Sequence, residues 1–110
     1  DPIPMQCTYP LQLQTFRNLL KACIAQRDLI TGKTLHALYF KSLIPPSTYL
    51  SNHFTHLNSK CGSLHNAQTS FHLTQYPNVF SYNTLINAYA KHSLIQIAHR
   101  VFYEIPQPDI

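Results

Sequence analysis

The sequence repeats at an interval of 31 residues, and this repetition limits the possible folds more than any other feature does. A shift of this length superimposes an amide, a cation, a small residue, an aromatic ring and a proline on identical partners. One shared helical period does not align such different residue types, so the chain contains a repeated structural unit. The pairs are Asn52 with Asn83, Lys60 with Lys91, Ala67 with Ala98, Phe71 with Phe102 and Pro77 with Pro108.

An earlier copy of the unit precedes these two, at a shift of 35 residues. That shift places Leu29 on Leu64, Gly32 on Ala67 and His36 on Phe71. The chain therefore divides into a longer unit at 13–47 and two shorter units at 48–78 and 79–109. Three prolines among residues 1–12 predict an irregular N-terminal extension.

Each unit is predicted to form two antiparallel helices. In the last unit, apolar residues at i, i+3, i+4 and i+7 mark one face of a helix that begins near Val79. A second helix runs from about Leu94 to Tyr103, and a proline-rich segment ends it because proline cannot continue a helix. One hairpin cannot bury its apolar face alone, whereas stacked hairpins can, so the sequence predicts an all-α solenoid. Small residues at equivalent places let the paired helices approach closely: Gly32, Ala67 and Ala98.

The composition fits a folded chain with a mild preference for polyanions. Apolar residues make up 45% of the chain and charged residues 11%, which argues against disorder. The net charge of +4 is weak evidence for a nucleic-acid partner, since many basic domains bind nothing anionic. Cys7, Cys23 and Cys61 have no paired spacing and favour reduced thiols over disulfides or a zinc site. No apolar run has the length of a membrane span.

The three units resemble pentatricopeptide repeats. The segment 79–109 looks like a short, 31-residue repeat, and 48–78 resembles another through its "N…SKCG…L..A...F" pattern. The segment 13–47 is similar to the long repeat type through "LLKAC" and "GK.LH". Mixed long and short repeats of this kind are typical of land-plant organellar RNA-binding proteins, and the chain resembles an N-terminal part of one. The resemblance covers about residues 13–110.

The resemblance implies that each repeat reads one RNA base. The fifth and last residues of a repeat would contact the base edge, the second would stack on the base, and the thirteenth would lie near phosphate. The first unit offers Arg17 with Ser47, and this basic side chain suits a phosphate better than a base. The last two units are similar to pairs that prefer a pyrimidine, with cytosine favoured, and then uracil. The expected residues are Asn52 with Asn78 and Asn83 with Asp109 for base reading, Tyr49 and Phe80 for stacking, and Lys60, Lys91 and Arg17 for phosphate.

These residues also have structural interpretations. An amide carries a donor and an acceptor, which suits the edge of a base, but Asn52 and Asn83 could instead cap a helix or satisfy backbone groups. Tyr49 and Phe80 could fill the core rather than stack on bases. The two lysines at helix ends favour the helix dipole, and this role is compatible with phosphate contact. The shared register of the units favours the functional interpretation of the amides.

Neither a metal site nor a catalytic site is predicted. His53 and His56 are three residues apart on one helix, but the spacing supplies no third ligand. No pair among the four carboxylates is spaced for acid–base chemistry, and the two glycines form no phosphate-binding loop. The chain is therefore expected to need no cofactor and to be no enzyme. Any deaminase-like domain of such a protein would follow in a C-terminal part.

The sequence thus predicts part of a sequence-selective, single-stranded RNA-binding array for RNA editing or processing in a mitochondrion or chloroplast. Editing or processing factors are further expected partners, and no membrane partner is expected. The organelle is inferred from the resemblance alone, because residues 1–12 show no transit-peptide pattern. The chain ends at Ile110, the first position of what would be another unit, which suggests a longer array. The alternative is a protein-binding array of the tetratricopeptide type, whose units of about 34 residues carry a characteristic Trp. This chain has no Trp.

Overall fold

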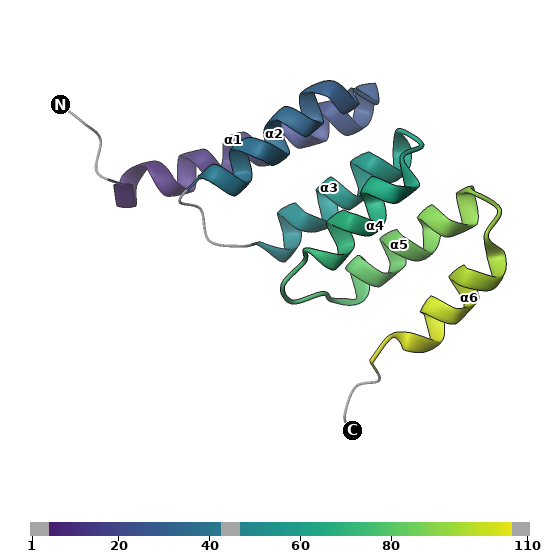
Figure 1. The fold of residues 1–110 in the computed structure, drawn as a ribbon. Helices are drawn as coiled ribbons and strands as arrows, with labels where there is room; N and C mark the ends of the chain where they lie inside the picture. The colour runs from purple at the N-terminus through teal and green to yellow at the C-terminus, as the bar shows by residue number, and fades with distance from the viewer. Residues whose placement is uncertain (1–4, 43–46, 107–110) are drawn as a thin grey trace.

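The computed structural model describes residues 5–42 and 47–106, with side chains from residue 13 onward, and in these ranges α-helices are joined by short turns and no strand is present. Figure 1 shows six helices that follow one another as three antiparallel hairpins. The predicted all-α solenoid is therefore confirmed. The helices are α1 (Met5–Gln26), α2 (Leu29–Lys41), α3 (Thr48–Lys60), α4 (Leu64–His72), α5 (Val79–Lys91) and α6 (Ile95–Glu104).

The N-terminal extension differs from the prediction. Residues 1–12 were expected to be irregular, yet α1 begins at Met5 and continues through Pro10. Proline lacks an N–H and interrupts one backbone hydrogen bond of a helix, but a helix tolerates that loss where the rest of its ladder continues. Residues 1–4, 43–46 and 107–110 lie outside the described residues.

Each hairpin turns through the same backbone motif. Arg27, Gly62 and Ser93 adopt positive φ angles of 54°, 80° and 61° in the turns that follow α1, α3 and α5. The N–H of the following residue reaches back to the carbonyl five residues earlier, and the N–H of the positive-φ residue reaches the carbonyl three residues earlier, as in a Schellman motif. The first type of bond joins Asp28 to Cys23, Ser63 to Asn58 and Leu94 to Tyr89, at 2.9, 2.8 and 2.9 Å. The three turns are spaced by 35 and 31 residues, the same intervals as the sequence repeat.

Side-chain caps start three of the helices. The carboxylate of Asp28 accepts from the backbone N–H of Thr31 ahead of α2, and the hydroxyl of Ser47 accepts from the N–H of Leu50 at the start of α3. Asn78 caps α5 and forms a reciprocal capping box with Ser81. The helices α3 and α5 thus begin at residues 48 and 79, where the second and third predicted units begin.

The hairpins stack into two layers. The first-helix layer consists of α1, α3 and α5, which pack side by side, with α3 in contact with both neighbours. The second-helix layer consists of α2, α4 and α6. Here α2 packs on α1 and α3, and α4 packs on α3 and α5, whereas within the described chain α2, α4 and α6 make no close contact with one another. A cavity of about 260 Å³ remains between α2 and α4. Only the first-helix layer therefore forms a continuous surface across the three hairpins.

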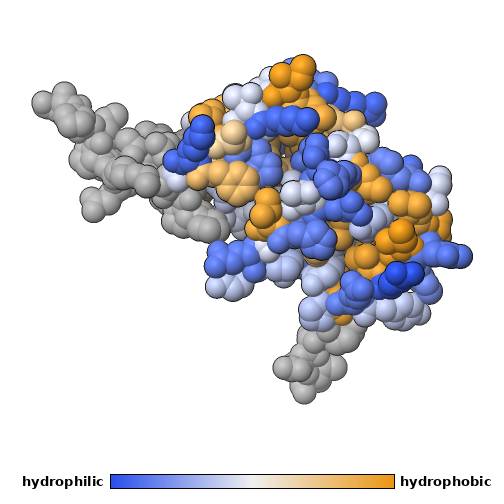
Figure 2. All heavy atoms as spheres, in the orientation of Figure 1, coloured by the Kyte–Doolittle hydropathy of each residue, from blue (hydrophilic) through white to orange (hydrophobic). Residues whose placement is uncertain are grey.

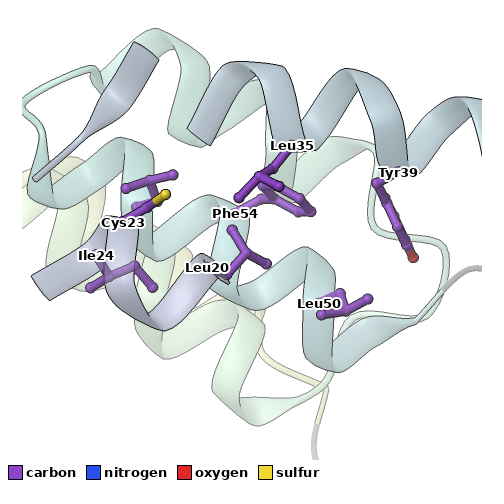
Figure 3. Close-up of a cluster of buried hydrophobic side chains, with 8 residues drawn as sticks. Leu20, Cys23, Ile24, Leu35, Tyr39, Leu50 and Phe54 are labelled. Carbon is purple, nitrogen blue, oxygen red and sulfur yellow. The ribbon is translucent and has the colours of Figure 1, made fainter. Parts of the chain in front are cut away.

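The apolar residues form two buried clusters. Figure 3 shows the larger one, where side chains of α1, α2 and α3 interdigitate around Leu20 and Phe54, and Cys61 packs at its margin. Burial raises the pKa of the Cys23 thiol in this cluster, and Cys23 and Cys61 are free, in agreement with the expected packing of reduced thiols. The second cluster joins α4, α5 and α6 around Leu85 and Tyr89. None of the helices in the described ranges has the length and apolar character that crossing a bilayer requires.

The small residues predicted at helix contacts are buried. Ala67 and Ala98 are 0% and 6% exposed. A Cβ atom at Gly32 would overlap the side chain of Leu57 on α3, so this position permits the close approach of α2 to α3. Apolar side chains remain exposed on α6, the last helix of the stack, and Figure 2 shows them gathered there. They include Ile95 and Phe102, which are 62% and 56% exposed.

Candidate nucleic-acid interface

A groove of about 410 Å³ lies between the N-terminal halves of α3 and α5 in the first-helix layer. Four of the residues that the sequence singled out for base contact line this groove. They come from two neighbouring units, so the groove exists only because the units stack. Its lining consists of Tyr49, Asn52, His53, His56, Asn78, Phe80 and Thr84.

Hydrogen bonds fix the floor of the groove. The Nδ2 atom of Asn52 donates to Oδ1 of Asn78 at 3.1 Å, and the hydroxyl of Ser81 donates to Oδ1 of Asn52 at 2.6 Å. The same Oδ1 of Asn78 accepts from the backbone N–H of Ser81 at 3.0 Å as the cap of α5. Asn52 is only 9% exposed, and these contacts use one of its two amide hydrogens and one of its two carbonyl lone pairs. The network orients the amide while leaving one donor and one acceptor position of Asn52 to spare.

This network shows how the amides of Asn52 and Asn78 are held in the structure. Asn78 is a helix cap, as its position at the end of a unit allows, and its side chain also holds Asn52. Asn52 caps no helix; it joins the second unit to the third. Asn83, its equivalent in the next unit, is exposed, and within the described chain nothing covers it in the way that Asn78 and Ser81 cover Asn52. Its expected partner Asp109 lies outside the described residues, so that pairing stays a prediction.

The two aromatic residues predicted for stacking flank the groove. Phe80 is 72% exposed and Tyr49 is 39% exposed, so neither belongs to the buried core. One neighbour of Tyr49 is the His53 ring, with centroids 4.2 Å apart. The other is the guanidinium of Arg17, which lies 4.3 Å from the centre of the Tyr49 ring in a cation–π contact. The carbon Cζ of Arg17, a residue expected to contact phosphate, thus lies over an aromatic ring that lines the groove, and its contact with phosphate stays a prediction.

A second groove of about 430 Å³ continues from the first along α3 and α5. The two grooves share His56 and Thr84 and together follow the helices from Tyr49 to Lys91. Among the described residues, no acidic side chain lines either groove. The lining of the second groove is His56, Ser59, Thr84, Asn87, Ala90 and Lys91.

Lysines set the electrostatics of the second groove. Partial burial of the His56 ring, whose residue as a whole remains exposed, lowers its pKa, and the nearby charges of Lys91 and then Lys60 lower it further, together with His53. These shifts show that the predicted phosphate-binding lysines, one from each unit, both act on the same imidazole. The combined groove is therefore aromatic at one end, amide-lined in the middle and cationic at the other end.

Sequence reasoning missed several polar residues of this site, among them Ser81, His56 and Thr84. The repeat comparison could not find Ser81, because the equivalent residue is Leu50, which belongs to the core. Helical periodicity does contain the signal for the others. Residues 49, 52, 53, 56 and 60 form one stripe along α3, and residues 80, 83, 84, 87 and 91 form the same stripe along α5.

The architecture places the protein among the α-solenoids of stacked helical hairpins. No family model and no solved structure matches the chain significantly. Three relatives from Arabidopsis thaliana are named as pentatricopeptide repeat-containing proteins. A mitochondrial one is 29% identical over 103 residues, 94% of this chain and 13% of its own length. A chloroplastic one is 31% identical over 77 residues (70% and 11%), and a third is 33% identical over 91 residues (83% and 12%).

These relatives support the assignment of the chain to the pentatricopeptide repeat family. The chain spans only about one eighth of the length of each of them.

Proposed function

We propose that this chain binds single-stranded RNA along the first-helix layer, with one base for each repeat. The observation that carries the proposal is the groove between α3 and α5. Together with its continuation along the same helices, it combines exposed aromatic rings, an oriented amide and Lys91, and none of the described lining residues is acidic. Stacking on aromatic rings stabilises bound bases by about 1–3 kcal/mol each, and lysines add an attraction to phosphate that depends on salt.

Base reading would fall to the amides at the middle of the groove. Asn52 with Asn78 would read a pyrimidine, and Asn83 with Asp109 would read a uracil in the next unit. Asn52 retains one donor and one acceptor that would bond the edge of a base. Because its amide is held in one orientation, only some base edges would fit. Tyr49 and Phe80 would stack on the bases, and Lys60, Lys91 and Arg17 would contact phosphates. The division into repeats at 13–47, 48–78 and 79–109 belongs to the same proposal.

The cellular role is proposed from the relatives. Relatives named as mitochondrial and chloroplastic favour an organellar protein, and we propose RNA editing or processing as its task. Other editing or processing factors would then act beside the RNA. The segment itself would select the transcript rather than carry out chemistry.

Asn83 offers the sharpest test, because it is exposed and its substitution leaves the buried network around Asn52 intact. Fluorescence anisotropy with pyrimidine-rich and purine-rich oligonucleotides of equal length should show tighter binding of the pyrimidine-rich RNA. Asn83→Ala should reduce this preference, by about 1–3 kcal/mol at most, by analogy with base readout in DNA. Gln96→Ala, which removes an exposed carboxamide from α6, is the matched control and should leave the preference unchanged.

The alternative is a scaffold that binds proteins. A well-folded chain that binds neither oligonucleotide at low salt would contradict the RNA proposal and favour that alternative.

A further inference from the structure

The second groove contains a residue to which the repeat comparison gives no role. His56 lies one helical turn beyond Asn52 on α3 and lines both grooves. Phosphates of a strand whose bases occupy the first groove would pass along this continuation, because the stripe leads from the amides to the lysines. His56 therefore lies where such a strand would change from base contacts to phosphate contacts.

Among the described residues, all the charged and titratable groups that act on His56 are basic. On its own helix these are Lys60 and His53, and on the neighbouring α5 the group is Lys91. The other residues around the second groove are Ser59, Thr84, Asn87 and Ala90, which carry hydroxyl or amide donors or no polar side chain at all. A site whose described lining offers several donors and cations, and no carboxylate, suits a phosphodiester rather than a metal ion or a basic peptide.

We propose that the second groove seats a phosphate of the bound RNA and that His56, in its protonated form, contacts this phosphate together with Lys60 and Lys91. The proposal rests on the RNA-binding function proposed above. In the binding step, the neutral imidazole takes up one proton from solvent and the resulting imidazolium donates an N–H to a phosphate oxygen. No covalent bond between the protein and the RNA forms or breaks. RNA binding is thus coupled to proton uptake at one residue.

The direction of this coupling is set by the surroundings of His56. Burial and the two lysines hold its pKa below the ordinary value of about 6.5, so the imidazole of the free protein is neutral near pH 7. A phosphate in the groove brings negative charge and raises the pKa of the bound form. Affinity should therefore rise as the pH falls through the bound-state pKa, and it should level off below the pKa of the free protein. Each unit by which RNA raises the pKa corresponds to about a tenfold gain in affinity.

The experiment measures binding of a short pyrimidine oligonucleotide between about pH 8 and pH 6, with circular dichroism at each pH to verify folding. The wild-type protein should bind more tightly at the lower pH. The slope of log K against log salt should also steepen by about 0.7, as one additional phosphate contact would produce. His56→Gln should remove both changes while it retains binding at the higher pH. His65→Gln, which removes an exposed imidazole of α4 outside both grooves, is the matched control and should retain both changes.

Two further measurements identify the contact. The imidazole resonances of His56 should report a higher pKa in the presence of the oligonucleotide than in its absence. An oligonucleotide with abasic sites retains the phosphates, so its weaker binding should show the same pH dependence. The proposal is overturned if the pKa of His56 stays constant on binding, if His56→Gln retains the pH dependence, or if abasic RNA loses it.

Failure of this inference differs from failure of the proposed function. Wild-type protein that binds RNA equally at all these pH values would contradict only the role of His56. Wild-type protein that binds no RNA at any of them would contradict RNA binding itself.

Discussion

Asn52 donates a hydrogen bond to Asn78 across the boundary between two repeated hairpins, and the accepting oxygen is the one that caps α5. The backbone N–H at the start of α5 requires an oxygen at this position of Asn78, and that oxygen in turn requires the NH₂ group of Asn52 to face it. The start of one hairpin thereby orients the amide of the hairpin before it. Residues that look independent in sequence form one structural element.

Removal of the Ser81 hydroxyl should destabilise the protein. Ser81→Ala removes the donor to Asn52 and the acceptor for the backbone N–H of Asn78, in a site that is 1% exposed. Loss of buried partners of this kind costs about 1–3 kcal/mol. Urea denaturation followed by circular dichroism measures the change. Thr84→Ala removes a hydroxyl that bonds only the carbonyl of Phe80 within the same helix, so it should cost clearly less. Equal costs for the two variants would contradict the importance of the network.

The three hairpin turns predict opposite effects for substitutions at equivalent positions. An L-residue in the left-handed region costs about 1–2 kcal/mol relative to its right-handed form. Ser93→Gly should therefore raise the free energy of unfolding, by less than this amount because glycine gains freedom in the unfolded chain. Gly62→Ala should lower it by about 1 kcal/mol, although the added methyl group meets no atom within 4 Å.

Thermal denaturation of the two turn variants distinguishes backbone strain from packing. Ser93→Ala is the matched control, because alanine in this turn would retain the backbone strain of the wild-type serine. This variant should therefore leave the free energy of unfolding nearly unchanged. A stabilisation by alanine as large as that by glycine would show that the side chain, and not the φ angle, is responsible.

The protein should lose stability as the pH falls from about 7 to 5, in part through His36. Its ring stacks on Phe54 with centroids 4.1 Å apart, and burial lowers its pKa. A lowered pKa in the folded state means that unfolding takes up a proton. This contribution to stability is therefore intact above the ordinary pKa of histidine and is lost as the pH falls through the lower, folded-state value.

Urea denaturation at several pH values tests this effect. His36→Phe places in the first unit the residue that the second unit has at the equivalent position, Phe71, and it should flatten the pH dependence. His65→Gln, on the exposed side of α4, should leave the pH dependence as it is. His56 should contribute to acid destabilisation in the same direction, because its pKa is also lowered. If the free energy of unfolding of His36→Phe depends on pH as that of the wild-type protein does, the buried imidazole of His36 is not a cause of the acid destabilisation.

Lys91, which lines the second groove, should determine part of the salt dependence of RNA binding. Lys91→Gln should weaken binding of all sequences alike and reduce the slope of log K against log salt by about 0.7. Lys33→Gln makes the same change of charge on α2, away from the two grooves, and should leave the slope nearly unchanged. Similar losses from both variants would indicate a general effect of net charge rather than a contact in the groove.

The sequence was sufficient to predict the repeated hairpins and the limits of most helices. Residues such as Ala67, Ala98 and the apolar stripe of α5 recur at the unit interval and are buried for the same reason in each unit. The N-terminal start of α1 was not predictable from proline content, because one missing N–H does not end a helix that otherwise continues. Residues that contact each other between units were harder to predict. Arg17 lies against Tyr49, and Ser81 against Asn52, and both contacts depend on how far one hairpin is offset from the next.

The gap between α2 and α4 has a mechanical consequence. Adjacent hairpins are joined within the α1, α3 and α5 row and by the packing of α2 on α3 and of α4 on α5, whereas α2 and α4 make no close contact with each other and leave a cavity between them. A small tilt between the first two hairpins would compress or widen this cavity. The same tilt is resisted in the first-helix layer, where α1 packs on α3 and the guanidinium of Arg17 lies over the ring of Tyr49. The width of the cavity between α2 and α4 therefore depends on how the first two hairpins are inclined to each other.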